Sequence, residues 1–309
     1  MTIAVPTILG LSYFGVVVLP HLAVHSANAS DPSLIGDWRG HFPHKNVAAP
    51  AMVFSVFFGL YVLRAKSLLA GSAIIGLAAV FLWNTGSKTS IAMLPSILVL
   101  GWMFERIRIL RPVVVLGGLV AVNVILMSAA TSSTLQSFLV SLGIDPSFTD
   151  RTSIWSVGLD AFARNPITGY GFRSFWQTEA LFRSDFSLYT WAVTAAHAHN
   201  GYLEQLLNGG MVGLVLVLIW LVLLPIGYAS RAFAGPNNSD LTRLFLRLWL
   251  FSLFLACLES PIFENTGPIW FAMLVSVFGL RLQAYALLLD PSPRKAATGS
   301  NTIVAANCR

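Results

Sequence analysis

Long apolar stretches alternate with short polar connections along most of the chain. A helix needs about 20 mostly apolar residues to cross the hydrocarbon core of a bilayer. Stretches that approach this length lie at 4–24, 48–64, 67–83, 89–104, 112–130, 201–227, 243–258 and 268–288. The pattern predicts an all-α fold, a polytopic bundle of about eight transmembrane helices.

The polar segments indicate one membrane domain with two polar additions. We expect residues 1–289 to form a single membrane domain, in which residues 131–200 make a long outer loop with short amphipathic helices. Residues 290–309 form a polar tail, which we expect to be cytoplasmic and disordered. The sequence shows no internal repeat and no second, soluble domain.

The first apolar stretch has two interpretations. Ala27-Asn28-Ala29 follows it with the small-residue pattern of a signal-peptidase site. Against a signal peptide, residues 1–10 contain no Lys or Arg, and Pro20 and His21 interrupt the apolar run. Under either interpretation residue 30 onward emerges on the outer side of the membrane.

Composition supports a membrane protein and excludes soluble globular domains, coiled coils and disordered chains. Hydrophobic residues make up 56% of the 309 residues and charged residues only 10%, with a mean hydropathy of +0.72. A soluble domain carries about 25% charged residues. The net charge of +6 does not indicate a nucleic-acid partner, because Lys and Arg gather in the cytoplasmic loops of membrane proteins. Two cysteines, Cys257 and Cys308, support neither a disulfide framework nor a Cys/His metal site, so we expect no metal and no cofactor.

The positions of Lys and Arg orient the predicted spans. With eight alternating spans, one face receives Arg64, Lys66, Arg106, Arg108, Arg111, Arg231, Arg243, Arg294 and Lys295, and this face is the cytoplasmic one. The connections 25–47, 84–88, 131–200 and 259–267 then face outward. The polar segments 38–46, 87–90, 150–155, 169–171 and 197–200 all fall in these outer connections. A single convergent site at the outer face is the simplest explanation.

Residues 149–165 have the pattern of an amphipathic helix, with Thr149 as N-cap, Asp150 in the first turn and Pro166 as the stop. Its apolar stripe contains Ile154, Trp155, Leu159 and Phe162. Arg151 falls within that stripe, where a guanidinium is costly unless it meets an anion or an aqueous cavity. We therefore expect Arg151 to point into a pocket, and Arg164 to be a solvated charge. Snorkelling of Arg151 at a helix end is the alternative.

His199 and Asn200 directly precede the sixth apolar stretch. A helix N-terminus favours the neutral imidazole, and a neutral imidazole can act as a general base. Glu204 follows one turn later and should face protein or water, because it begins to enter the bilayer. We expect His197 to be structural. Interfacial polarity without a catalytic role is the alternative for the whole segment.

Basic residues also gather before the second stretch and between the third and fourth. Arg39, His44, Lys45 and Asn46 suit a phosphate-bearing partner, and Lys88 can add a cation to the same cavity. Anchoring at the membrane interface is an equally simple interpretation. Gly169-Tyr170-Gly171 is better explained as a turn than as a nucleotide loop, and Gly209, Gly210 and Gly213 favour close helix packing.

The order of these motifs resembles the O-antigen ligase and bacterial polysaccharide polymerase family, most closely the branch of exopolysaccharide polymerases. The residues that carry the resemblance are Arg39-Gly40-His41-Phe42-Pro43-His44-Lys45-Asn46, Arg151-Thr152-Ser153-Ile154-Trp155, Pro166-Ile167-Thr168-Gly169-Tyr170-Gly171, and His199-Asn200 followed after nine residues by Gly210. The resemblance covers residues 38 to about 225. Relatives usually have several more helices before the first of these motifs, and many have arginine at the place of Lys88.

The resemblance implies a metal-independent glycosyl transfer at the outer face of the bacterial inner membrane. The donor is a glycan on undecaprenyl pyrophosphate, and the acceptor is a sugar hydroxyl on lipid A core or on another glycan. Matching positions make His199 and Arg151 expected catalytic residues, and Glu204 is added as a third because of its position one turn into the sixth apolar stretch. Expected substrate-binding residues are Arg39, His44, Lys45, Asn46, Lys88, Trp155 and Asn200. A transporter or flippase of a lipid-linked anionic glycan, and a truncated relative without catalysis, are the alternatives.

Overall fold

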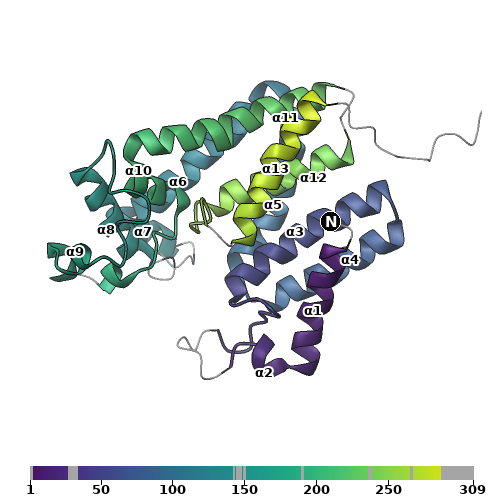
Figure 1. The fold of residues 1–309 in the computed structure, drawn as a ribbon, viewed down its shortest axis with the longest axis horizontal. Helices are drawn as coiled ribbons and strands as arrows, with labels where there is room; N and C mark the ends of the chain where they lie inside the picture. Colours follow the sequence, from purple (N-terminus) through teal and green to yellow (C-terminus); the bar gives the residue numbers. More distant parts are fainter. Residues whose placement is uncertain are drawn as a thin grey trace, which may run out of the picture.

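The computed structural model describes residues 3–26, 34–141, 143, 148, 151–188, 191–235, 239–264 and 267–286. Within these ranges the chain forms helices and connections and no β-strand. One isolated β-bridge joins Val24 and Trp38. The fold is an all-α bundle (Figure 1). The predicted tail at 290–309 and the small-residue pattern at 27–29 lie outside the described residues.

All eight apolar stretches are helical. The α-helices are α1 (Ala4–Val18), α2 (Pro20–Ala23), α3 (Lys45–Ala65), α4 (Leu68–Asn84), α5 (Lys88–Arg106), α6 (Gly118–Thr131), α7 (Ser133–Ser141), α8 (Arg151–Arg164), α9 (Glu179–Phe182), α10 (Gly201–Leu218), α11 (Leu224–Ala234), α12 (Asp240–Leu255) and α13 (Pro268–Tyr285). Short 3₁₀ or π segments are η2 (Arg108–Leu110), η3 (Val113–Gly117), η4 (Asp185–Leu188), η5 (Trp191–Thr194) and η6 (Ile219–Leu223).

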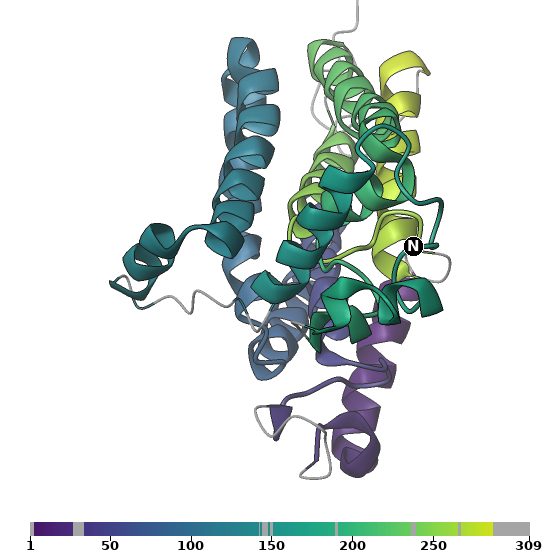
Figure 2. The ribbon, with the colours of Figure 1, turned by 90° about the vertical axis from the view of Figure 1, so that its left-hand side faces the viewer.

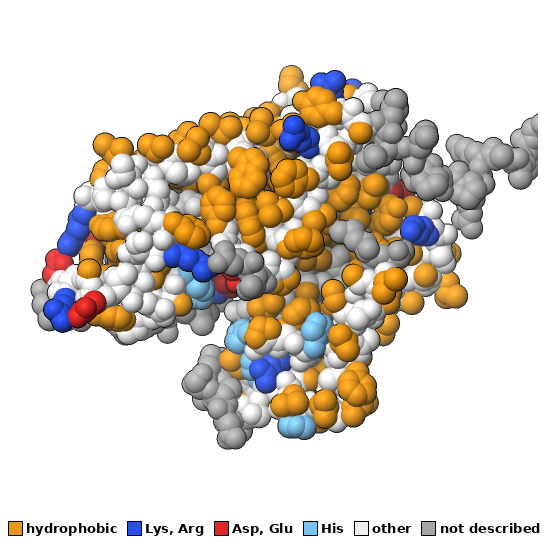
Figure 3. All heavy atoms as spheres, viewed as in Figure 1, with side chains coloured by type: hydrophobic (Ala, Val, Ile, Leu, Met, Phe, Trp, Pro, Cys, Tyr) orange, Lys and Arg blue, Asp and Glu red, His pale blue; other side chains and the backbone are white. Residues whose placement is uncertain are grey.

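Length and hydropathy support a multi-pass membrane protein. Helices long and apolar enough to cross a bilayer run over Lys45–Ala65, Val113–Thr131, Gly201–Ala234 and Pro268–Tyr285, and shorter apolar helices run over Ala4–Val18 and Leu68–Asn84. Exposed apolar side chains cover much of the face formed by α10, α11 and α13 (Figure 3), as a lipid-facing surface requires. The predicted fold class is confirmed.

Two helices differ in detail from the prediction. The first apolar stretch is divided at Leu19, which has non-helical backbone angles, because the residue before a proline is restricted and Pro20 starts a new turn. The predicted span 201–227 extends to Ala234 and contains a break at Gly210, whose φ is +60°. The predicted amphipathic helix is α8, while Thr149 and Asp150 lie outside the described residues.

Helices α3 and α4 make the closest helix pair, because two glycines remove side chains at their contact. A Cβ on Gly71 would lie 2.4 Å from the backbone of Leu63, and one on Gly59 would lie 2.7 Å from the side chain of Ile75. Small residues let helix backbones approach closely in membranes, where helix association depends on packing. This pair fixes the loop after α4 beside the start of α3.

The predicted grouping of the connections at two ends of the bundle agrees with the contacts. At one end, Arg243 Nε donates to Glu105 Oε2 at 2.9 Å, which joins α12 to α5. At the opposite end, Gly201 N donates to the Ala256 carbonyl at 2.7 Å, which joins the start of α10 to the end of α12. Figure 2 shows α6 running lengthwise along one side of the molecule, with the short helix α7 projecting outward from it. The motif-bearing connections meet at the second of these ends.

Candidate functional site

A cavity of about 600 Å³ opens where the motif-bearing connections meet. We call it the cation cavity. Its charged and imidazole side chains are those of Asp37, His44, Lys45, Lys88, Arg151 and Glu259, and Asn46 and Ser87 also line it. It therefore collects five of the residues that the sequence predicts for the site. Arg39 does not line this cavity but a more apolar one of about 510 Å³ between α1 and residues 39–43.

Three helices begin at residues that line the cation cavity. They are α3 at Lys45, α5 at Lys88 and α8 at Arg151. A helix N-terminus carries free N–H groups and a partial positive charge, both of which favour an anion. The start of α3 is capped, since His44 Nδ1 accepts from Asn46 N at 3.1 Å. The Ser87 side chain makes no such bond at the start of α5, so N–H groups there remain available to a ligand.

Carboxylates pair with two of the three cations of the cavity. Lys45 Nζ lies 2.5 Å from Asp37 Oδ2, and Arg151 Nη2 lies 2.8 Å from Glu259 Oε1. Arg151 Nη1 also donates to the carbonyl of Leu258. Among the residues that the structure describes, Lys88 has no carboxylate within ion-pair distance, and its side chain is exposed. Lys88 is therefore the cation most accessible to an incoming anion.

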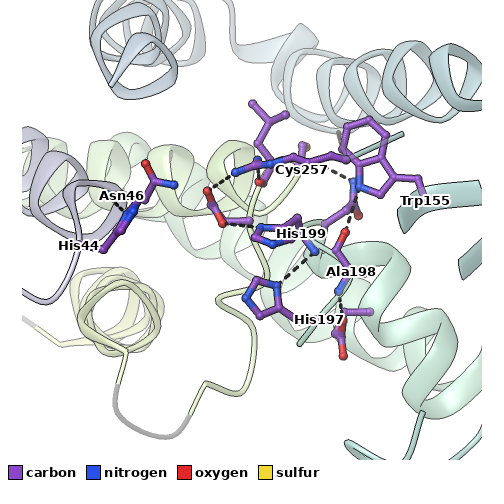
Figure 4. Close-up of polar contacts among 12 residues, drawn as sticks. His44, Asn46, Trp155, His197, Ala198, His199 and Cys257 are labelled. Carbon is purple, nitrogen blue, oxygen red and sulfur yellow. Dashed lines mark hydrogen bonds and ion pairs between the residues drawn. The ribbon is translucent and has the colours of Figure 1, made fainter. Parts of the chain in front are cut away.

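Glu259 joins Arg151 to His199. Its second oxygen, Oε2, lies 3.3 Å from His199 Nδ1, so one carboxylate holds a guanidinium and an imidazole side by side (Figure 4). Burial alone would raise the pKa of Glu259, but the bond to His199 and the charge of Arg151 bring that pKa below its usual value. The carboxylate therefore stays ionised at neutral pH. Because the Glu259 carboxylate faces Nδ1, the other ring nitrogen of His199 is left to exchange a proton.

The backbone next to His199 is held by two buried side chains. Glu204 Oε2 accepts from Ala198 N at 2.7 Å and from Trp176 Nε1 at 3.1 Å, and Trp155 Nε1 donates to the Ala198 carbonyl at 3.0 Å. His199 itself has a φ of +48°, which a non-glycine residue adopts only when its surroundings impose it. Trp155 and Glu204 thus fix the peptide from which the His199 side chain projects (Figure 4).

Asn200 fixes the other side of His199. Its Oδ1 caps α10 by accepting from Tyr202 N at 3.0 Å and Leu203 N at 2.9 Å. Its Nδ2 donates to Asn123 Oδ1 at 2.9 Å and to the Cys257 carbonyl at 2.8 Å. The Asn200 side chain is fully buried, and all these partners are protein atoms. The structure therefore gives Asn200 a positioning geometry, which ties α10 to α6 and to the end of α12.

Comparison with known proteins connects this geometry to a family. The family model described as O-antigen ligase matches residues 51–218, which is more than half of the chain. The chain belongs to the O-antigen ligase family. Among curated proteins, the exopolysaccharide production protein ExoQ of Rhizobium meliloti (strain 1021) is 27% identical over 225 residues, covering 67% of this chain and 50% of ExoQ. The chain thus spans about half the length of that relative.

The P-x-x-G-x-G motif at Pro166–Gly171 makes backbone hydrogen bonds to the residues around the break in α10. Tyr170 N donates to the Leu207 carbonyl at 2.7 Å, and Met211 N donates to the Pro166 carbonyl at 2.9 Å. A Cβ on Gly210 would lie 2.1 Å from the Ile167 carbonyl oxygen, so no other residue fits there. The motif forms a turn that replaces missing helix hydrogen bonds, and it holds the long loop against the helix that carries His199.

Arg164 is a solvated charge, as the sequence suggests, whereas His197 lies against His199. His197 Nδ1 accepts from His199 N at 3.3 Å, and the two rings are 4.1 Å apart. Burial, followed by the charge of His199, lowers the pKa of His197 to about 4, so its ring is neutral at pH 7. Arg164 is exposed, pairs with Asp185 at 2.9 Å and lies far from the residues that line the cation cavity.

Besides Asp37, the sequence analysis misses Glu259. It directly follows the apolar run of α12, where a single acidic residue has the pattern of ordinary interfacial polarity. Its position in an outward connection is the only signal that could have found it. Among the described residues no group of three His, Cys, Asp or Glu side chains lies close enough to hold a metal ion.

Proposed function

We propose that the protein transfers a glycan from undecaprenyl pyrophosphate to a sugar hydroxyl at the periplasmic face of the bacterial inner membrane. The observation that carries this proposal is the cation cavity, where three helix N-termini and three cations surround a space beside a carboxylate-bound histidine. A diphosphate diester carries two negative charges, and fixed cations stabilise the charge that develops as it leaves.

This geometry supports the following reaction. Lys45, Lys88 and Arg151 hold the diphosphate, while the acceptor hydroxyl lies at the free ring nitrogen of His199. The hydroxyl oxygen bonds to the anomeric carbon of the donor glycan, and its proton passes to His199. The bond from that carbon to the diphosphate oxygen breaks, and the electron pair leaves with the polyprenyl diphosphate. Glu259 stabilises the imidazolium by accepting a hydrogen bond from its Nδ1–H group.

The relative ExoQ favours polymerisation over ligation. Its name describes the production of an exopolysaccharide. In polymerisation the acceptor hydroxyl belongs to another glycan of the same kind, whereas in ligation it belongs to lipid A core. The acceptor proposed for this chain is therefore a glycan.

The experiment is a transfer assay with purified protein in liposomes and a polyprenyl diphosphate-linked glycan from the producing strain. We expect new glycosidic bonds with the unaltered protein, and a loss of at least about 10²-fold for Arg151→Ala and His199→Ala. Arg164→Ala, on the same helix as Arg151, is the matched control and should transfer normally. Full transfer by both site variants, or movement of the lipid-linked glycan across the bilayer without bond formation, would overturn the proposal.

A further inference from the structure

Four residues near His199 form a second polar and aromatic surface, which we call the aromatic rim: Phe172, Arg173, Phe263 and Glu264. The rings of Phe172 and Phe263 lie 6.4 Å apart at 85°, and Arg173 Cζ lies 5.7 Å from the centre of the Phe172 ring. Phe172 is 56% exposed, and Arg173 and Glu264 are also exposed. None of the four lines the cation cavity.

The aromatic rim adjoins the proposed base. The ring of His197 contacts the ring of His199, and the charge of Arg173 acts on His197. Glu264 feels the charges of both Arg173 and Glu259, and it shares a connection with Glu259. Glu259, which faces His199 Nδ1 at 3.3 Å, thus lies both at the cation cavity and in the connection that carries Phe263 and Glu264. Charged side chains gather beside a hollow in this part of the molecule (Figure 3).

Backbone strain at the aromatic rim indicates a constraint beyond folding. Arg173 has a φ of +54° and Phe263 a φ of +63°. Such angles cost about 1–3 kcal/mol each, and connections at a surface can usually relax them. Here Arg173 N is held by Asn208 Oδ1 at 3.0 Å, and Phe263 packs 5.1 Å from the ring of Trp270. Strain kept in place by such contacts is typical of functional sites.

An aromatic belt at the membrane interface does not explain the aromatic rim. Belt residues place their rings among lipid headgroups and chains. Trp220 and Trp270, behind Phe263, suit that environment. Phe172 instead contacts the guanidinium of Arg173, and Phe263, its partner ring, directly precedes Glu264; both charges are exposed and require water around them. An exposed ring and a half-buried ring beside an arginine and a carboxylate match the chemistry of a sugar, which offers apolar C–H faces and pairs of neighbouring hydroxyls.

We propose that Phe172, Arg173, Phe263 and Glu264 form the subsite for the acceptor glycan, which places a sugar hydroxyl at His199. The two rings stack on the C–H faces of the sugar, and Arg173 and Glu264 bond to its hydroxyls. The inference rests on the proposed function, because it assigns an acceptor to the transfer at His199.

The test measures transfer and binding separately. The acceptor is a set of oligosaccharide fragments of the polysaccharide made by the producing strain. For Phe172→Ala and Arg173→Gln we expect the KM for the acceptor to rise about tenfold, while kcat at saturating acceptor and the KM for the donor stay within twofold. Phe182→Ala, which removes another exposed phenylalanine of the same loop, is the matched control and should change none of these values.

Direct binding separates the two proposals. Calorimetric titration of the fragments into the purified protein should show binding that both variants weaken about tenfold. Unchanged acceptor KM and unchanged binding in Arg173→Gln, which removes no packed side chain, would overturn the subsite. If the unaltered protein binds the fragments through these residues but forms no glycosidic bond, the subsite stands and the proposed function fails.

Discussion

Replacing Glu259 by glutamine tests the chemistry at the centre of the site. Both neighbours of the carboxylate are donors: Arg151 Nη2 bonds to one oxygen at 2.8 Å, and His199 Nδ1 faces the other at 3.3 Å. An amide has one oxygen and one NH₂ group, so it can accept from only one of them. If the oxygen stays on Arg151, the NH₂ group faces Nδ1 and forces the ring proton onto the other nitrogen. His199 then has no free nitrogen to accept the proton of the acceptor hydroxyl.

The distances set the size of the effect. At 3.3 Å and an effective dielectric constant of about 20, a carboxylate stabilises an imidazolium by at most about 5 kcal/mol. Solvent screens part of this, because the His199 side chain is 31% exposed. A remaining loss of about 2.7 kcal/mol corresponds to a 10²-fold lower rate. We therefore expect Glu259→Gln to lower kcat about 10²-fold, within the range of general-base catalysis.

Steady-state kinetics distinguishes this effect from a loss of donor binding. Glu259→Gln releases Arg151 from its ion pair, so the KM for the diphosphate donor should stay the same or fall. Glu259→Asp keeps the charge and should recover part of kcat. Glu179→Gln, which removes a carboxylate from an exposed pair with Arg183, is the control. A kcat within threefold of the unaltered protein, or a loss that lies entirely in the KM for the donor, would refute the reasoning.

Three further changes test the framework of the site. Gly210→Ala should destabilise the protein by at least about 2 kcal/mol in thermal unfolding in detergent, because its Cβ would strike the Ile167 carbonyl at 2.1 Å and its φ is +60°. Gly209→Ala, with no atom within 4 Å, should be tolerated. The transfer rate of Glu204→Gln should stay within about threefold of normal, because an amide oxygen can accept the same two N–H bonds. The rate of Glu204→Ala should fall at least about tenfold, because both donors lose their acceptor. An equal loss of rate in both variants would instead give Glu204 a catalytic charge. Between pH 6.5 and about 4 the unfolded chain binds a proton at His197 that the folded chain does not. The free energy of unfolding should therefore fall by up to about 3 kcal/mol as the pH drops through this range. His197→Asn should flatten this slope in the same unfolding assay.

Hydropathy predicts the helices of this protein well because the membrane imposes their length. Every backbone N–H and C=O group in lipid needs an internal partner, which leaves helices as the structure for each apolar stretch. Hydropathy cannot reveal the break at Gly210, because the apolar stretch continues after it and the backbone groups around it bond to Pro166–Gly171. Those partners lie about 40 residues away in the chain, beyond the reach of local periodicity.

The site is predictable where a charge interrupts an apolar stripe or where basic residues gather in one connection, as at His44, Lys45 and Asn46. Arg151 stands out because it interrupts an apolar stripe, and the structure places it at the cation cavity. Trp155 matches that stripe, and it is buried with its indole on the Ala198 carbonyl. Glu259 contradicts nothing locally, so its role emerges only when the fold brings residues 151, 199 and 259 together. Pairwise contacts between distant segments carry information that a single sequence does not.

The carboxylates of the cation cavity balance most of its positive charge. Three cations and two carboxylates line the cavity, which leaves one formal positive charge when His44 is neutral. Three unpaired cations in one cavity would repel one another and destabilise the fold. Asp37 and Glu259 remove that repulsion while no donor is bound, and the diphosphate can then take over part of their contacts with Lys45 and Arg151. The site is thus able to hold a doubly charged diphosphate donor without storing an equal excess of positive charge in its absence.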